Sequence, residues 1–163
     1  MHHNTFILLL VVFVTILPAL DAWWLVGKNG NNRQCPRRGS ASPYYFGTTN
    51  LACMINGKRK RRAPSRGVWE YTHRFIYYQG YYFEFSNRGI FVHRNRIDSH
   101  RCSGGTESSP AGYSYLDVEC IKNCAHSYRR NFGNYNFLSN NCHHFANKLS
   151  EVLCTRSSCP SWC

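Results

Sequence analysis

Acidic residues are scarce in this chain of 163 residues, which has 8 Asp and Glu against 20 Lys and Arg and therefore a formal net charge of +12. This balance favours anionic partners such as nucleic acid, acidic glycans or anionic lipid headgroups, and charge alone does not choose among them. Charged residues make up only 17% of the chain, whereas hydrophobic residues make up 43% and aromatic residues 15%. That composition excludes a disordered protein. The length excludes a large multidomain enzyme and fits about one domain.

Long apolar runs are scarce as well. The longest, FILLLVVFVTILPAL at residues 6–20, has no charge and is shorter than the ~20 residues that a membrane-spanning helix needs. It follows a polar N-terminus and precedes the small residue Ala22, which predicts a signal peptide over residues 1–22. An uncleaved N-terminal anchor is the alternative. After its removal no apolar run could span a bilayer, so we expect a secreted, extracellular protein without a transmembrane segment.

Cysteine pairs with the CxxC spacing of structural zinc sites are missing, although the chain has nine cysteines. We therefore expect a disulfide framework, no metal and no cofactor. The remaining zinc alternative is Cys120 and Cys124, four residues apart beside His126. An odd number of cysteines leaves one unpaired or in an intermolecular bridge. The nine are Cys35, Cys53, Cys102, Cys120, Cys124, Cys142, Cys154, Cys159 and Cys163.

Residues 23–66 are rich in Gly, Asn, Ser and Pro and predict a basic, loop-rich N-terminal extension, with short strands only at WWLV (23–26) and LACMI (51–55). The extension contains a run of five basic residues. An exposed solvated loop, a patch for an anionic surface or polyanion, and a processing site for a secretory protease at RKRR (59–62) all explain this run. Cleavage there would make the extension a pro-region. A specific nucleic-acid partner is not expected in a secreted protein. The run comprises Lys58, Arg59, Lys60, Arg61 and Arg62.

Residues 67–163 carry the regular patterns of a folded domain. Aromatic and β-branched residues over 68–86, interrupted only by Gln79 and Gly80, predict a strand, a tight turn and a second strand. GIFVH at 89–93 adds a third strand. Apolar residues spaced by three and four predict a helix over 113–130.

A final helix is predicted from the apolar residues Phe145, Ala146, Leu149, Val152 and Leu153, with Asn140 or Asn141 as its N-cap. Cys142 then lies in the first turn, where backbone N–H groups and the helix dipole favour a thiolate. Half of a disulfide is the alternative for Cys142. A nucleophile would need a base, for which the sequence offers His73, His93, His100, His126, His143 and His144.

Residues 135–154, YNFLSNNCHHFANKLSEVLC, followed by PSW at 160–162, resemble the C-terminal signature of the PPPDE family. These permuted papain-fold thiol peptidases include the DeSI desumoylating isopeptidases. THRFIYYQGYYFEFSNRGI at 72–90 is similar to the family's other hallmark, in which a histidine opens a strand hairpin. The resemblance covers residues 68–162. It implies an α+β, permuted papain-like fold with a small antiparallel sheet packed against helices, stapled by disulfides.

The resemblance also implies that Cys142 is the nucleophile and His73 the general base of a cysteine peptidase or isopeptidase acting on a protein or peptide. If Cys142 is the free thiol, the other eight cysteines form four disulfides. Asn141 and His144 belong to the same motif as possible supporting residues, and His144 is the next candidate base. His143 stands where the family usually has asparagine.

If the hairpin is one residue shorter here, Glu84 falls where the related lecithin retinol acyltransferase-like enzymes carry a second histidine. It could orient His73 from the neighbouring strand or be a structural carboxylate. Acyl transfer or lipid hydrolysis on the same scaffold, and a catalytically inactive basic, disulfide-rich binding protein, are the two alternative functions. The known isopeptidases resemble cytosolic and nuclear proteins, so their substrate is not carried over to a secreted chain.

Overall fold

The computed structural model describes residues 35–56 and 72–163. The predicted signal peptide (1–22), the WWLV segment (23–26) and the basic run (58–62) lie outside these ranges. The cysteines and the predicted final helix lie inside them, and so does the predicted hairpin except for residues 68–71.

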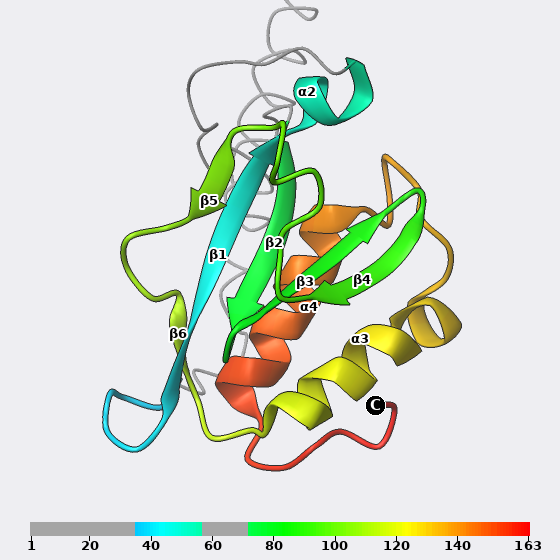
Figure 1. Ribbon diagram of the computed structural model, residues 1–163. Coiled ribbons are helices and arrows are strands. Elements are labelled where there is room, and N and C mark those ends of the chain that lie inside the picture. The colour runs from blue at the N-terminus through cyan, green and yellow to red at the C-terminus, as the bar shows by residue number, and fades with distance from the viewer. Residues whose placement is uncertain (1–34, 57–71) are drawn as a thin grey trace, which may run out of the picture. The chain divides into compact units, whose positions relative to one another are not determined.

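One six-stranded sheet, antiparallel throughout, forms the centre of the described fold (Figure 1). Its strand order is β4-β3-β2-β1-β5, and β6 also pairs with β1. The strands are β1 (Ser42–Asn50), β2 (Thr72–Tyr78), β3 (Tyr81–Ser86), β4 (Gly89–His93), β5 (Gly104–Thr106) and β6 (Gly112–Ser114).

Three helices accompany the sheet: α2 (Leu51–Asn56), α3 (Val118–Phe132) and α4 (Cys142–Thr155). Figure 1 shows α4 crossing β2 and β3, with α3 beside it, and both helices contact the sheet. The structure therefore confirms the α+β class, an antiparallel sheet packed against helices. Within the described residues, no helix is both long and apolar enough to cross a membrane.

The hydrophobic core fills the space between the sheet and the two long helices. Phe85 illustrates it, since its ring contacts the rings of Tyr128, Tyr135 and Phe145. Burial of this face of α4 aligns the helix on β2 and β3 and so fixes where its first turn lies. The largest fully buried apolar side chains of the core are Tyr44, Ile76, Tyr78, Phe83, Phe85, Ile121, Phe145, Leu149 and Leu153.

The predicted hairpin is confirmed, with its turn at Gln79 and Gly80. Both residues have positive φ, 44° and 83°, which is the conformation of a type I′ turn. Such a turn matches the right-handed twist of the flanking strands and sets their register, in which Phe75 lies opposite Glu84. The third predicted strand is also present, as β4.

The loop-rich prediction for residues 42–56 is wrong. Residues 42–50 form β1, which pairs with β2 along seven residue pairs and with β5 and β6 on its other side. Gly47 suggests a loop in the sequence, but in the structure it lets the ring of Phe75 pack close to the backbone of β1. A Cβ at this position would lie 2.2 Å from that ring. Residues 51–55 form a helix and not a strand, since Leu, Ala and Met favour helices and Asn50 Oδ1 accepts a capping hydrogen bond from the Cys53 N–H at 2.9 Å.

The predicted helix over 113–130 begins later than expected, at Val118. Tyr113 pairs with Pro43 in the ladder between β6 and β1. The first residues of the predicted helix therefore belong to a strand, although their apolar spacing is helical. The apolar stripe of Cys120, Ile121 and Cys124 is buried, as predicted.

Eight cysteines form four disulfides, and Cys142 is the free one. This confirms the expected disulfide framework and the pairing of all cysteines except Cys142. Two of the bridges attach the segment 35–56 to the C-terminal part of the chain. The bridges are Cys35–Cys154, Cys53–Cys102, Cys120–Cys159 and Cys124–Cys163.

Candidate active site

Strands β2 and β3 place His73 and Glu84 on the same face of the sheet. Side chains alternate along a strand, so His73 shares a face with Phe75, and Glu84 lies directly opposite Phe75. His73 and Glu84 are therefore diagonal neighbours, which long side chains can bridge. Both are buried, with exposed fractions of 1% each.

The two side chains are joined by a hydrogen bond of 2.8 Å between His73 Nε2 and Glu84 Oε2. The other carboxylate oxygen of Glu84 accepts a hydrogen bond of 2.6 Å from the backbone N–H of Ile97. Both oxygens thus have partners, and the carboxylate is held against rotation. Glu84 thus contacts His73 from the neighbouring strand, which is the position that an orienting role requires.

Cys142 is the first residue of α4, as predicted, and Asn141 is the N-cap. Asn141 Oδ1 accepts hydrogen bonds from the backbone N–H groups of His143 (2.9 Å) and His144 (3.4 Å). Its Nδ2 donates to the carbonyl of Phe137 at 2.7 Å. Asn141 therefore positions the first turn of α4 and also ties down the loop before it.

The Cys142 thiol and the His73 imidazole lie close enough for each to shift the pKa of the other. Because Nε2 of His73 is bonded to Glu84, Nδ1 is the ring nitrogen left for the thiol. The Cys142 thiol also lies 3.9 Å from the carbonyl oxygen of Thr72, the residue before His73. The sulfur atom is thus next to the first residues of β2, with 3% of Cys142 exposed.

Burial has the largest influence on both ionisable groups and opposes their charged forms, but their mutual contact outweighs it. The pKa of Cys142 is lowered from 9.0, because the hydrogen bond and charge of His73, and hydrogen bonds from the backbone N–H groups of Arg74 and His143, overcome burial. Burial likewise lowers the pKa of His73, but hydrogen bonds and charges of Cys142 and Glu84 raise it to about 9. Both shifts favour a thiolate paired with an imidazolium over a neutral thiol beside a neutral imidazole.

The two histidines after Cys142 have structural positions. His143 Nε2–H donates to the carbonyl oxygen of Thr72 at 3.2 Å. Burial above all lowers the pKa of His143, and the charges of Arg74, His73 and His144 add to the shift, so His143 stays neutral beside the reactive pair. His144 is exposed, and its side chain completes the capping box with Asn141.

The other candidate bases do not lie at this site. His93 is exposed at the end of β4, and His100 and His126 are exposed on a loop and on α3. The structure therefore brings Cys142, His73 and Glu84 together, with Asn141 supporting them.

A cleft of about 590 Å³ lies next to His73. Cys142 is not among its lining residues, so the cleft reaches the reactive pair from the imidazole side. Of the lining residues, sequence patterns identified only His73 as a candidate site residue. The others come from α2, from the end of β3 and the turn after it, and from the segment between α3 and α4. The lining residues are Leu51, Met54, Ile55, His73, Ser86, Asn87, Arg88, Tyr135 and Phe137.

Sequence reasoning also missed the backbone N–H of Ile97 as a partner of Glu84. A backbone donor leaves no residue-type signal, so only the path of the 94–103 loop reveals it. That loop is anchored to the sheet by Arg96, which donates to Thr49 Oγ1 at 2.8 Å and to the carbonyl of Cys102 at 3.1 Å.

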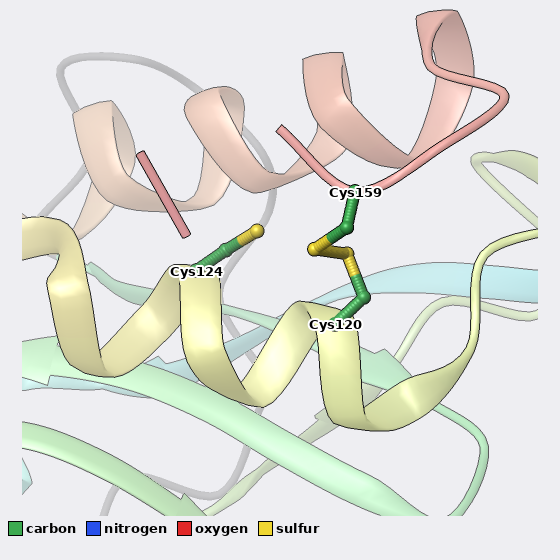
Figure 2. A group of neighbouring side chains, drawn as sticks. All are labelled: Cys120, Cys124 and Cys159. Atoms are coloured by element: carbon green, nitrogen blue, oxygen red, sulfur yellow. A yellow bond between two sulfur atoms is a disulfide. The ribbon is translucent and has the colours of Figure 1, made fainter. Parts of the chain in front are cut away.

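Three cysteine sulfurs gather within 4.8 Å of one another, from Cys120, Cys124 and Cys159 (Figure 2). Figure 2 shows the bond between Cys120 and Cys159, with Cys124 one turn further along α3. Cys124 is itself bonded to Cys163. The cluster is thus a pair of adjacent disulfides, and a sulfur in a disulfide is not the thiolate that zinc requires.

Comparison of the chain with protein-family models, with curated proteins and with solved structures finds no match.

Proposed function

We propose that this protein is a secreted cysteine hydrolase that cleaves an amide or isopeptide bond with Cys142, His73 and Glu84. The observation that carries the proposal is the buried chain of contacts from the Cys142 thiol through His73 to Glu84, whose Oε2 lies 2.8 Å from His73 Nε2. A nucleophile, a base and a residue that orients the base form the arrangement that thiol and serine hydrolases share.

The chemistry follows from the states of the three side chains. The Cys142 thiolate attacks the carbonyl carbon, and the tetrahedral intermediate carries its negative charge on the former carbonyl oxygen, beside backbone N–H groups at the start of α4. The His73 imidazolium donates its proton to the leaving amine, and the C–N bond breaks to give a thioester on Cys142. Neutral His73 then takes a proton from water, the hydroxide attacks the thioester, and the acid product and the thiol are released.

A permuted papain-like fold fits this arrangement, as the resemblance to the PPPDE family implies. The histidine stands on a strand of an antiparallel sheet and precedes, in chain order, the cysteine at the start of a packed helix. A secretory destination is supported by the four disulfides, which form and persist in oxidising compartments.

The test is hydrolysis by the secreted full chain of N-acetyl-peptide coumarylamides and, in parallel, of p-nitrophenyl esters of fatty acids. We expect the wild type to cleave amides, and both Cys142→Ser and His73→Gln to lose at least about 10²-fold in kcat/KM. His126→Gln is the matched control, because His126 is an exposed histidine on α3 that does not line the cleft. It should retain full activity.

Two results would contradict the proposal. Turnover that persists in Cys142→Ser would show that the cysteine is not the nucleophile. Cleavage of the esters alone, with no amide cleaved, would favour the acyltransferase-like alternative.

A further inference from the structure

The cleft beside His73 has an apolar part built by two segments that are distant in the sequence. Helix α2 contributes Leu51, Met54 and Ile55, and the segment between α3 and α4 contributes Tyr135 and Phe137. Two of these side chains are largely exposed, Ile55 at 61% and Phe137 at 57%. Both segments are held in place, α2 by the disulfide Cys53–Cys102 and the Phe137 carbonyl by Asn141.

Exposed large apolar side chains cost free energy in water, and burying them against a ligand removes that cost. Single exposed apolar residues are common on proteins and need no explanation. Ile55 and Phe137 differ, because they line one concave site next to a reactive imidazole. A concave apolar wall at such a place is the ordinary form of a substrate subsite.

The other part of the cleft is polar and carries positive charge. It is formed by Ser86, Asn87 and Arg88 at the turn between β3 and β4. Arg88 is 55% exposed at its side chain and pairs with Asp98 at 3.3 Å, and Arg101 pairs with the same carboxylate at 3.1 Å. Two guanidinium groups share one carboxylate, so the cluster of Arg88, Arg101 and Asp98 has a formal charge of +1.

We propose that the cleft binds an extended peptide whose large apolar side chain packs on Ile55 and Phe137 and whose acidic side chain pairs with Arg88. This proposal rests on the proposed function, since it names the substrate class of that site. A peptide fits better than an acyl chain, because the amide of Asn87 can both donate to and accept from a peptide group. An acyl chain would cover these polar groups without bonding them.

The test measures binding without turnover, by fluorescence polarisation with the full-length Cys142→Ala protein. Four fluorescein-labelled tetrapeptides combine leucine or serine at one position with glutamate or lysine at the next, and fluorescein-labelled dodecanoic acid is the fifth probe. We expect the peptide with leucine and glutamate to bind about tenfold or more tightly than the other three. The fatty acid should bind more weakly than that peptide.

Variants assign the two preferences to their residues. Ile55→Ser and Phe137→Ser should each reduce the preference for leucine, and Arg88→Gln should abolish the preference for glutamate over lysine. Tyr115→Ser is the matched control, because Tyr115 is as exposed as Ile55, at 61%, but does not line the cleft. It should change neither preference.

Equal binding of all four peptides, tighter binding of the fatty acid, or preferences unchanged in the cleft variants would each overturn the proposal. Because the measurement uses Cys142→Ala, its result does not depend on hydrolysis. A wild type that fails to hydrolyse any amide, combined with the expected binding pattern, would refute the proposed activity and leave the peptide site standing.

Discussion

His73 and Glu84 form a charged pair in a place where both are 1% exposed. Such a pair loses the hydration of two ions, so its attraction is offset by desolvation and is a weak source of stability. Apolar side chains of similar volume in place of His73 and Glu84 would stabilise the sheet about as well. Buried ionisable groups whose pKa is shifted, as the pKa of His73 is, cluster at functional sites. The pair is therefore best explained by its contact with Cys142.

Replacing Glu84 should raise the pH at which Cys142 reacts. In the wild type the thiolate is paired with the His73 imidazolium between the lowered pKa of Cys142 and the His73 pKa of about 9. Glu84→Gln removes one of the influences that raise the pKa of His73, so the imidazolium is lost at a lower pH. The thiolate then loses its partner and the pKa of Cys142 rises. We expect alkylation of Cys142 by iodoacetamide at pH values below the His73 pKa to slow by about tenfold or more.

The measurement is the alkylation rate of native protein against pH, with the modified residue identified by peptide mass mapping. Glu119→Gln is the control, since Glu119 is an exposed acid on α3 that pairs with Lys122, and its pH profile should match the wild type. An unchanged profile in Glu84→Gln would show that Glu84 does not act through His73.

At the scale of secondary structure, the start of α4 contributes both to the stability of the fold and to the candidate active site. Its apolar face is buried against the sheet, and its first turn holds Cys142 and the donors around it. Asn141 contributes to both, because its side chain caps the helix and bonds the carbonyl of Phe137.

Asn141→Ala should therefore destabilise the fold and loosen the cleft together. Loss of an N-cap costs about 1 kcal/mol, and the free energy of unfolding from urea titration should fall by about that amount. Asn123→Ala is the comparison, because Asn123 is exposed inside α3, where alanine has the higher helix propensity. That variant should be as stable as the wild type or slightly more so, and equal stability of Asn141→Ala would show that the cap is dispensable.

For the molecule as a whole, the disulfides decide what a cut in the basic run would release. The strand β1 has β2 on one side and β5 and β6 on the other, so the sheet cannot be completed without it. Cys35–Cys154 and Cys53–Cys102 tie this part of the chain to the part that carries His73 and Cys142. Processing after Arg62 stays a prediction, and the residues of that run lie outside the described ranges.

If the chain is cut after Arg62, the segment carrying β1 should remain attached. We expect one species on a non-reducing gel and two after reduction, the larger beginning at Ala63. The cut protein should stay folded as long as its disulfides are intact. After reduction β1 has no covalent attachment to the rest of the fold, and once it dissociates β2 becomes an edge strand. Edman sequencing with paired reducing and non-reducing gels checks this, with Arg59→Gln/Arg62→Gln as the uncut control. Release of the N-terminal segment without reductant would contradict the disulfide pairing.

Local patterns in the sequence determined the elements whose signals lie among neighbouring residues. Gln79 and Gly80 marked the hairpin, the spacing of Phe145, Leu149 and Leu153 marked α4, and the residues around Cys142 placed it at a helix start. These predictions succeeded because turn geometry, helical period and helix capping depend on residues a few positions apart.

Only the tertiary structure decided which distant segments meet. The sequence allowed the eight paired cysteines about 105 connectivities, assigned residues 42–50 to loops, and left the role of Glu84 open. The strand β1 is recognisable mainly by its partners, Glu84 reaches His73 only through the register of β2 and β3, and Ile97 contributes a backbone N–H. Each of these depends on the free energy of packing segments far apart along the chain, which no local pattern records.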